Sequence, residues 1–235
     1  MAKHRSKRYQ KAAALVQTGK SYSLSDAILT VKQFPAPKFT PTVTLSFHLG
    51  VDPRKSDQMV RGSVSLPHGT GKNVRVAVFA QGAAADAATA AGAEFVGFED
   101  LIKKVQEGFT DFDSAIATPD AMTEVRKIAR ILGPRGLMPN PKTGTVTEDT
   151  GKAVREVKAG RVDFKLDKNG NVSGSIGKTT FQPEQLEENA RAFVGSVVRA
   201  KPASAKGNYI QAVTLAASML PGIPLEAAVY TKAST

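Results

Sequence analysis

The residues in this sequence best suited to chemistry are glycines beside basic side chains, which could hold a phosphate group. The first such segment is Gly69-Thr-Gly71-Lys72. A Walker-type phosphate loop needs a glycine five residues before the Gly-Lys pair and a serine or threonine after the lysine. Leu66 and Asn73 stand at those places, and Val74 replaces the third glycine of a dinucleotide fingerprint. We therefore interpret the segment as a turn between domains.

A second segment of this kind is the turn-rich stretch 133–144, which carries Arg135 and Lys142 among glycines and prolines. Basic glycine-rich loops often bind anions. The same composition is typical of a rigid surface loop. The residues alone leave both interpretations open.

Signatures of catalysis and of metal binding are missing. The sequence has no Gly-x-Ser-x-Gly elbow, and carboxylate pairs such as Glu187-Glu188 are adjacent, so they diverge around a helix. It contains no cysteine, and its three histidines do not have metal-ligand spacing. We predict a protein that is not an enzyme and that has no cofactor and no metal site.

The charge balance predicts a polyanionic partner. The chain has 32 Lys and Arg against 21 Asp and Glu, a formal net charge of +11. Basic residues that neutralise phosphates release condensed counterions, which favours nucleic acid. Residues 1–20 contain six basic residues and no acidic one. They are either a solvated arm or, as the overall charge favours, an arm that lies on nucleic acid.

Length and apolar content predict a folded protein of one or two domains. The chain has 235 residues, 41% of them hydrophobic. Its longest apolar runs are shorter than the ~20 residues that span a bilayer, and the apolar run after the basic N-terminus is too short for a signal peptide. We expect a cytoplasmic protein.

The pattern of the chain changes twice, which predicts an inserted domain. Residues 23–34 have helical spacing, 42–49 alternate strictly as in a half-buried strand, and 61–66 form a shorter alternating run. From about residue 70 apolar strands alternate with helices, which is typical of an α/β unit with a mainly parallel sheet. The expected strands are 74–80, 94–96 and 114–118, and the expected helices are 83–91, 99–107, 121–132 and 151–157.

After residue 160 the sequence again has the pattern that it has before residue 70, with short alternating strands and an amphipathic helix. Residues 162–166 and 171–176 flank Asp167-Lys-Asn-Gly170, which predicts a β-hairpin. A helix that begins near Pro183 and a strand over 207–219 follow. The expected architecture is an α+β domain split between residues 1–69 and 161–235, with an inserted α/β, Rossmann-like domain at 70–160, joined by a hinge.

Several segments together resemble the family of bacterial large-subunit ribosomal protein L-one, the universal stalk protein family. The resemblance covers essentially the whole chain, in order and spacing. Its segments are Lys38-Phe39, Gly50-Val-Asp-Pro-Arg-Lys-Ser-Asp-Gln58, Val60-Arg-Gly-Ser-Val-Ser-Leu-Pro-His-Gly69, Ile131-Leu-Gly-Pro-Arg-Gly-Leu-Met-Pro-Asn-Pro-Lys142, Lys158-Ala-Gly-Arg161 and Ala205-Lys-Gly207.

The resemblance implies a ribosomal protein whose split domain binds the stalk region of large-subunit rRNA. It also implies that the stalk assists release of deacylated tRNA from the exit site. Members of the family are further implied to repress translation by binding the mRNA leader of their own operon. The partners expected from it are therefore these three RNAs, with the protein a monomer within the ribosome and no membrane partner.

Site residues carried over by position are basic, aromatic or hydroxyl-bearing. The family's Thr-Met-Gly contact corresponds to Ser218, Met219 and Leu220, and the leucine departs from the pattern because it puts a side chain where a nucleotide would approach closely. The residues alone leave Phe39 open between core and contact, and they favour the core for Met219. With Arg5 of the N-terminal arm, the expected RNA contacts are Arg5, Lys38, Phe39, Arg54, Arg161, Phe164, Lys165, Lys178, Ser218 and Met219.

Two other classes of function remain open at this point. One is a nucleotide-dependent enzyme built on the α/β insertion, which micromolar binding of ATP or NAD would support. The other is a general nucleic-acid coat protein, which would be indifferent to the sequence and fold of its RNA.

Overall fold

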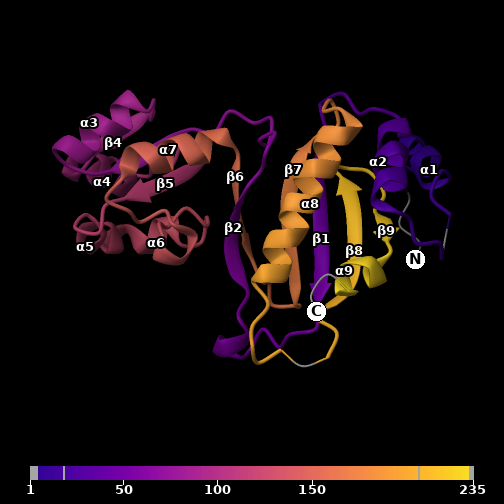
Figure 1. The fold of residues 1–235 in the computed structure, drawn as a ribbon. Helices are drawn as coiled ribbons and strands as arrows, with labels where there is room; N and C mark the ends of the chain where they lie inside the picture. Colours follow the sequence, from indigo (N-terminus) through magenta and orange to yellow (C-terminus); the bar gives the residue numbers. More distant parts are fainter. Residues whose placement is uncertain (1–4, 18, 206, 233–235) are drawn as a thin grey trace. The chain divides into compact units, whose positions relative to one another are not determined.

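The computed structural model describes residues 5–17, 19–205 and 207–232, which form two compact units (Figure 1). The terminal unit combines the chain up to Gly71 with the chain from Val162 onward, and the inserted unit is Lys72–Arg161. Lys3, His4 and Lys206, all in segments considered above, lie outside the described residues. No helix of the described chain is long and apolar enough to cross a membrane.

A four-stranded antiparallel sheet is the centre of the terminal unit. Its order is β7-β1-β8-β9, with β1 at Thr42–Leu49, β7 at Asn171–Lys178, β8 at Ile210–Ala217 and β9 at Ile223–Leu225. The alternation of β1 confirms the predicted half-buried strand, since Val43, Leu45, Phe47 and Leu49 are buried and the residues between them are not.

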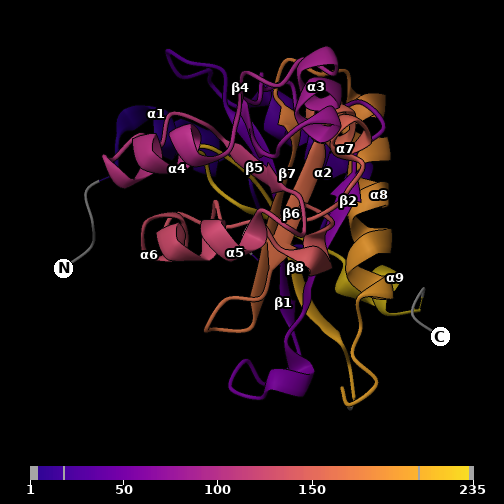
Figure 2. The same cartoon turned by 90° about the vertical axis from the view of Figure 1, so that its left-hand side faces the viewer.

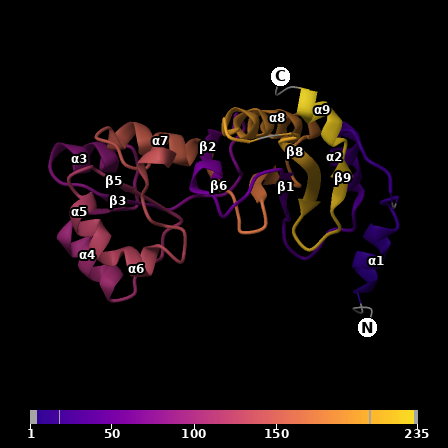
Figure 3. The same cartoon turned by 90° about the horizontal axis from the view of Figure 1, so that it is seen from below.

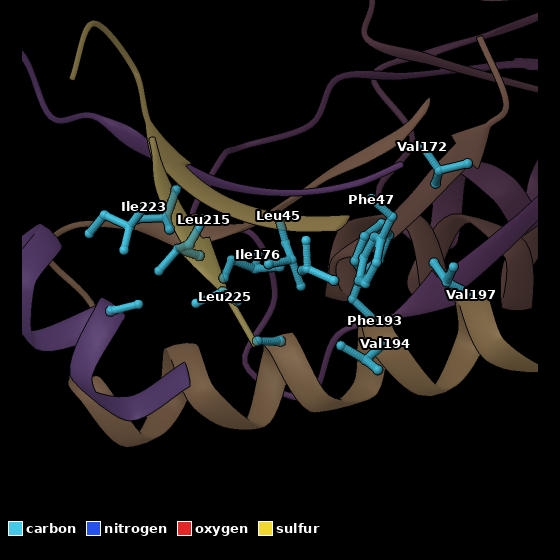
Figure 4. Close-up of a cluster of buried hydrophobic side chains, with 14 of the residues drawn as sticks. Leu45, Phe47, Val172, Ile176, Phe193, Val194, Val197, Leu215, Ile223 and Leu225 are labelled. Atoms are coloured by element: carbon cyan, nitrogen blue, oxygen red, sulfur yellow. The ribbon is translucent and has the colours of Figure 1, made fainter. Parts of the chain in front are cut away.

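Helices cover one face of this sheet. They are α2 at Leu24–Gln33, α8 at Pro183–Arg199 and the short α9 at Ala227–Lys232; Figure 3 shows α8 and α9 along that side. Ser23 caps α2 by accepting the N–H of Asp26, as the sequence indicates. Apolar side chains of the sheet meet those of α8 in the core, where the rings of Phe47 and Phe193 lie 5.8 Å apart (Figure 4).

The predicted hairpin is wrong. The turn exists, because the N–H of Asp167 donates to the carbonyl of Asn171 over 2.8 Å. However, β6, at Arg161–Lys165, pairs with β2, at Arg61–Ser65, in a separate two-stranded sheet, while β7 pairs with β1. The chain therefore changes sheets at a turn whose sequence is typical of a hairpin, and long-range pairing decides where each strand goes.

The inserted unit is a three-layer α/β structure. Its parallel sheet has the order β4-β3-β5, with β3 at Val76–Phe79, β4 at Phe95–Gly97 and β5 at Ser114–Ala117. Every residue of β3 is buried, as expected for a strand covered on both faces. This confirms the predicted combination of an α+β unit with an α/β unit.

Two helical layers cover the sheet of the inserted unit (Figures 2 and 3). Ala77 and Phe79 of β3 face one layer, and Val76 and Val78 face the other. The first layer contains α4 (Glu99–Gln106), α5 (Met122–Val125), the 3-10 turn η2 (Arg126–Ile128) and α6 (Ala129–Leu132). The second contains α3 (Ala83–Ala90) and α7 (Thr150–Ala159). The single helix predicted over 121–132 is thus three consecutive pieces.

Candidate nucleic-acid interface

The excess positive charge of the chain lies almost entirely in the terminal unit. That unit holds 19 Lys and Arg against 9 Asp and Glu, which is +10, while the inserted unit holds 13 against 12, which is +1. A surface that attracts a polyanion through net charge is therefore expected on the terminal unit.

Lys38 and Phe39 lie on an exposed segment between α2 and β1. The prolines at 35 and 37 prevent the helix from continuing, so the chain reaches β1 in extended form. The side chain of Lys38 is exposed and that of Phe39 is 47% exposed, which is high for a phenylalanine. The structure therefore resolves the choice left open for Phe39: its ring lies on the surface and not in the core.

Strand pairing brings further predicted residues to the same end of the sheet, the upper end in Figure 1. Thr42 begins β1 and pairs with Lys178 at the end of β7. On its other side, the N–H of Ser218 donates to the carbonyl of Thr42 over 3.0 Å. Phe39 is three residues from Thr42, so at most about 10 Å of chain separates them. Lys38, Phe39, Lys178, Ser218 and Met219 thus form one sheet-end cluster.

Met219 has the most unusual conformation in this cluster. Its side chain is 72% exposed, and its φ of 61° makes it the one residue other than glycine with positive φ in the described chain. The left-handed region is unfavourable for a side chain with a Cβ, and such conformations gather at functional sites. Its carbonyl accepts a hydrogen bond from Arg8 over 3.4 Å.

Leu220 does not obstruct this surface. Its N–H donates to the carbonyl of Ala217 over 3.0 Å, which closes a tight turn after β8. The turn directs the leucine side chain into the hydrophobic core, where it is 9% exposed, and leaves Met219 outside. The concern that a side chain at this position would meet an approaching nucleotide is therefore wrong.

A basic helix that the sequence did not predict lies in the N-terminal arm. Helix α1 spans Lys7–Ala13, and Ser6 caps it by accepting the N–H of Tyr9 over 3.3 Å. The guanidinium of Arg5 lies 4.7 Å from the ring centre of Tyr9. Because Arg8 binds the carbonyl of Met219, the start of the arm is attached to the sheet-end cluster.

The outer face of the four-stranded sheet carries hydroxyl groups that the sequence analysis missed. Between the buried residues of the strands stand Thr44, Ser46, Ser173, Ser175 and Thr214, all partly or fully exposed. The registers place Ser46 opposite both Ser173 and Thr214, and the Ser173 hydroxyl donates to that of Ser46 over 2.9 Å. The polar half of each alternating strand was the available signal.

Arg54 and Lys165 are not part of the sheet-end cluster. Arg54 lies in the loop after β1, at the opposite end of that strand, and its N–H donates to the Asp52 carboxylate over 3.0 Å. Lys165 is exposed on β6, in the two-stranded sheet. Nearby, the N–H of Asn171 lowers the pKa of Asp167 by holding its carboxylate ionised.

Two expected contact residues are not available on the surface. Phe164 is 3% exposed, with its ring packed edge-on against Phe193 at 5.6 Å and over the backbone of Gly62. The expectation that it contacts RNA is corrected by this burial. The side chain of Arg161 is 13% exposed, pairs with Glu156 at 2.8 Å and donates to the carbonyl of Thr143. It stabilises a loop of the inserted unit instead of pointing to solvent.

The chemistry of the sheet-end cluster suits an RNA chain. An exposed ring can stack on a base, while lysine side chains meet phosphates. Hydroxyl groups donate and accept hydrogen bonds, so they can recognise the 2′-hydroxyl of ribose. Within the described ranges, no group of three or more His, Asp or Glu side chains is arranged to hold a metal ion.

Comparison with known proteins identifies close relatives. A model of the ribosomal protein L1p/L10e family matches residues 31–221. The chain is similar to the large ribosomal subunit protein uL1 of Frankia alni, at 55% identity over 94% of this chain and 93% of that protein. It is also similar to uL1 of Bifidobacterium longum subsp. infantis, at 53% over 94% and 96%, and to uL1 of Thermobifida fusca, at 52% over 94% and 94%.

Proposed function

The chain belongs to the ribosomal protein L1p/L10e family, and we propose that it binds the stalk region of large-subunit rRNA through its terminal unit. The family is one of ribosomal proteins and not of enzymes, so the nucleotide-dependent enzyme is set aside. The observation that supports the proposal most directly is the sheet-end cluster, in which an exposed Phe39 and a left-handed Met219 stand beside Lys38 and Lys178.

Binding begins, in this proposal, with electrostatic attraction of folded RNA to the unit of charge +10. The cluster then fixes the RNA at one end of the sheet by stacking and by contacts to phosphates. The hydroxyl-bearing sheet face beside it recognises ribose and phosphate oxygens. Arg5 lies in the arm near the cluster, whereas Arg54 and Lys165 would contact a different part of the RNA.

The same surface supports two finer proposals. An mRNA leader that presents a similar RNA fold would compete for the cluster, so we propose repression of the chain's own operon. We also propose that the protein assists release of tRNA from the exit site. Both rest on the resemblance described above. We further propose that the two units fold as separate domains, 1–69 with 161–235 and 70–160, which move about a hinge.

The test is a filter-binding titration with a stalk rRNA fragment at fixed salt. Phe39→Ala should weaken binding about tenfold, because a base stacked on an aromatic side chain contributes about 1–3 kcal/mol. Lys142→Ala, which removes a positive charge in the inserted unit, should change binding much less. Leu29→Ala is a matched control, since Leu29 is 49% exposed on α2 and outside the cluster.

Equal losses for Phe39→Ala, Lys142→Ala and Leu29→Ala would contradict the assignment of the main site to the cluster. The slope of log affinity against log salt should reach several units if about 6–10 phosphates are contacted. A general coat protein would bind an unrelated RNA of the same length equally well, so a large preference for the stalk fragment separates the two classes.

A further inference from the structure

The inserted unit has a group of arginines that its own acidic residues do not neutralise. Five of its other cations are in ion pairs, namely Lys72 and Arg75 with Asp113, Lys127 with Glu124, Lys158 with Glu94, and Arg161 with Glu156. In contrast, Arg126 and Arg130 are exposed and make no ion pair with any residue that the structure describes. A near-neutral unit therefore has a locally cationic edge.

The fold determines which way these arginines point. Val125, Ile128 and Leu132 are buried in the core of the inserted unit, on the inner side of the helical path α5-η2-α6. Arg126 and Arg130 lie between them on the outer side, four residues apart. At a rise of about 1.5–2 Å per residue, they are separated by about 6–8 Å along the helical path. Figure 2 looks onto this layer, with α4, α5 and α6 along one side of the unit.

Arg135 extends the same edge from a rigid turn. The N–H of Leu137 donates to the carbonyl of Leu132 and that of Gly136 to Gly133, both over 3.0 Å, and Gly136 has a φ of 73°. This is a Schellman motif, which ends a helix in a fixed way. Arg135 is exposed just before the glycine and contacts the hydroxyl of Thr110.

The loop that follows is held by hydrogen bonds between its own residues. The carbonyl of Asn140 accepts hydrogen bonds from the N–H groups of Thr143 and Thr145, and the side chains of both threonines are buried. Hydrogen bonds between its own residues therefore order the end of the stretch 133–144. This order is compatible with anion binding, because the turn after α6 and the contact with Thr110 hold Arg135 in place.

We propose that Arg126, Arg130 and Arg135 bind the phosphate backbone of an RNA segment other than the one that the terminal unit holds. Residues 122–142 contain five basic residues and one acidic residue, Glu124. The guanidinium group is planar and binds phosphate oxygens in pairs, so arginine is suited to this contact. The large exposed hydrophobic side chains of the described chain all belong to the terminal unit, which argues against a peptide or a membrane at this edge.

The inference rests on the proposed function, because the terminal unit is taken to hold the stalk rRNA. The full chain is first saturated with a stalk rRNA fragment, and a fluorescent 20-base-pair RNA duplex of unrelated sequence is then titrated in. The test variant is Arg126→Gln with Arg130→Gln. The matched control is Lys152→Gln with Arg155→Gln, which removes the same charge from α7, on the opposite face of the same sheet.

The expected result is about a tenfold loss of duplex affinity for the test variant at about 0.1 M salt, and a salt slope lower by between one and two units. The control should lose less than twofold. Equal losses in the two variants, or no loss in the test variant, would overturn the inference. If the stalk fragment does not bind in the first step, the proposed function has failed. Titration of the RNA-free proteins with the duplex then still compares the test variant with the control variant, so the two failures are distinguished.

Discussion

Replacing Met219 with glycine should stabilise the terminal unit and weaken RNA binding at the same time. The φ of 61° at Met219 is unfavourable for any residue with a Cβ and is free of strain for glycine. Because the side chain is 72% exposed, its loss removes little packing in the free protein. The proposed contact of this side chain with RNA is lost in the complex.

The size of the effect follows from two opposing contributions. The left-handed conformation costs about 1–2 kcal/mol for a residue other than glycine. Glycine loses about 0.5–1 kcal/mol more conformational entropy on folding. Met219→Gly should therefore raise the free energy of unfolding by about 0.5–1 kcal/mol. Burial of an exposed methionine side chain against RNA contributes about 1.5 kcal/mol, so its loss weakens binding about tenfold.

Tyrosine fluorescence measures the stability of the terminal unit selectively. The chain has no tryptophan, and its four tyrosines, Tyr9, Tyr22, Tyr209 and Tyr230, all lie in that unit. A urea titration followed by this signal should move its midpoint upward by about 0.5 M for Met219→Gly. Met219→Ala is the control, because it keeps the strained φ and removes the same contact with RNA.

The two variants separate strain from contact. Met219→Ala should have near wild-type stability, and both variants should lose affinity for the stalk fragment to a similar extent. If alanine and glycine give the same stability, the argument from backbone strain is refuted. If either variant keeps wild-type affinity, Met219 is not an RNA contact.

Three further predictions concern stability. Gly195→Ala should stabilise the terminal unit by about 0.5–1 kcal/mol in the same urea titration, because a Cβ there meets nothing within 4 Å and glycine is unfavourable inside a helix; a loss of stability would show that the position is not open. Asn189→Ala should destabilise the terminal unit by at least about 2 kcal/mol, because this fully buried amide forms hydrogen bonds with the backbone of His68, Gly69 and Ile176. A urea midpoint near that of the wild type would contradict that role. In the inserted unit, the hydrogen bond from Lys72 lowers the pKa of Asp113. The ionised carboxylate therefore stabilises the unit above pH 3.8, the ordinary pKa, and this stabilisation is lost as pH falls through the lowered pKa. Amide exchange in β3 and β5 should show the loss, and Asp113→Asn should make the stability of the unit less dependent on pH.

Local patterns were sufficient for elements whose own residues determine their structure. Strict alternation located β1 at the predicted residues, and a capping serine with two prolines bounded α2. The hairpin was wrong because an Asn-Gly turn specifies a reversal of the chain but not the partner of each strand. That partner depends on residues more than 100 positions away.

The candidate site shows the same limit. Resemblance supplied Lys38, Lys178 and Met219, but their meeting at one sheet end depends on the registers of β1 with β7 and β8. The error at Phe164 was avoidable from the sequence, because neighbouring residues of a strand point to opposite faces. With Lys165 placed outside, Phe164 had to point into the core.

The strand order of the terminal unit has a consequence for how the protein is made. Among the described residues, strand β1 pairs with β7 and β8 alone, and the residues of both follow the whole inserted unit in the sequence. During synthesis at about 5–20 residues per second, the first strand must wait roughly 10–30 s for its partners to emerge. The inserted unit, whose strands are close in sequence, can fold in that interval. A nascent chain whose first 165 residues or so have emerged from the ribosome should therefore carry a folded middle and an unpaired, apolar-faced first strand, which is the stage most exposed to aggregation.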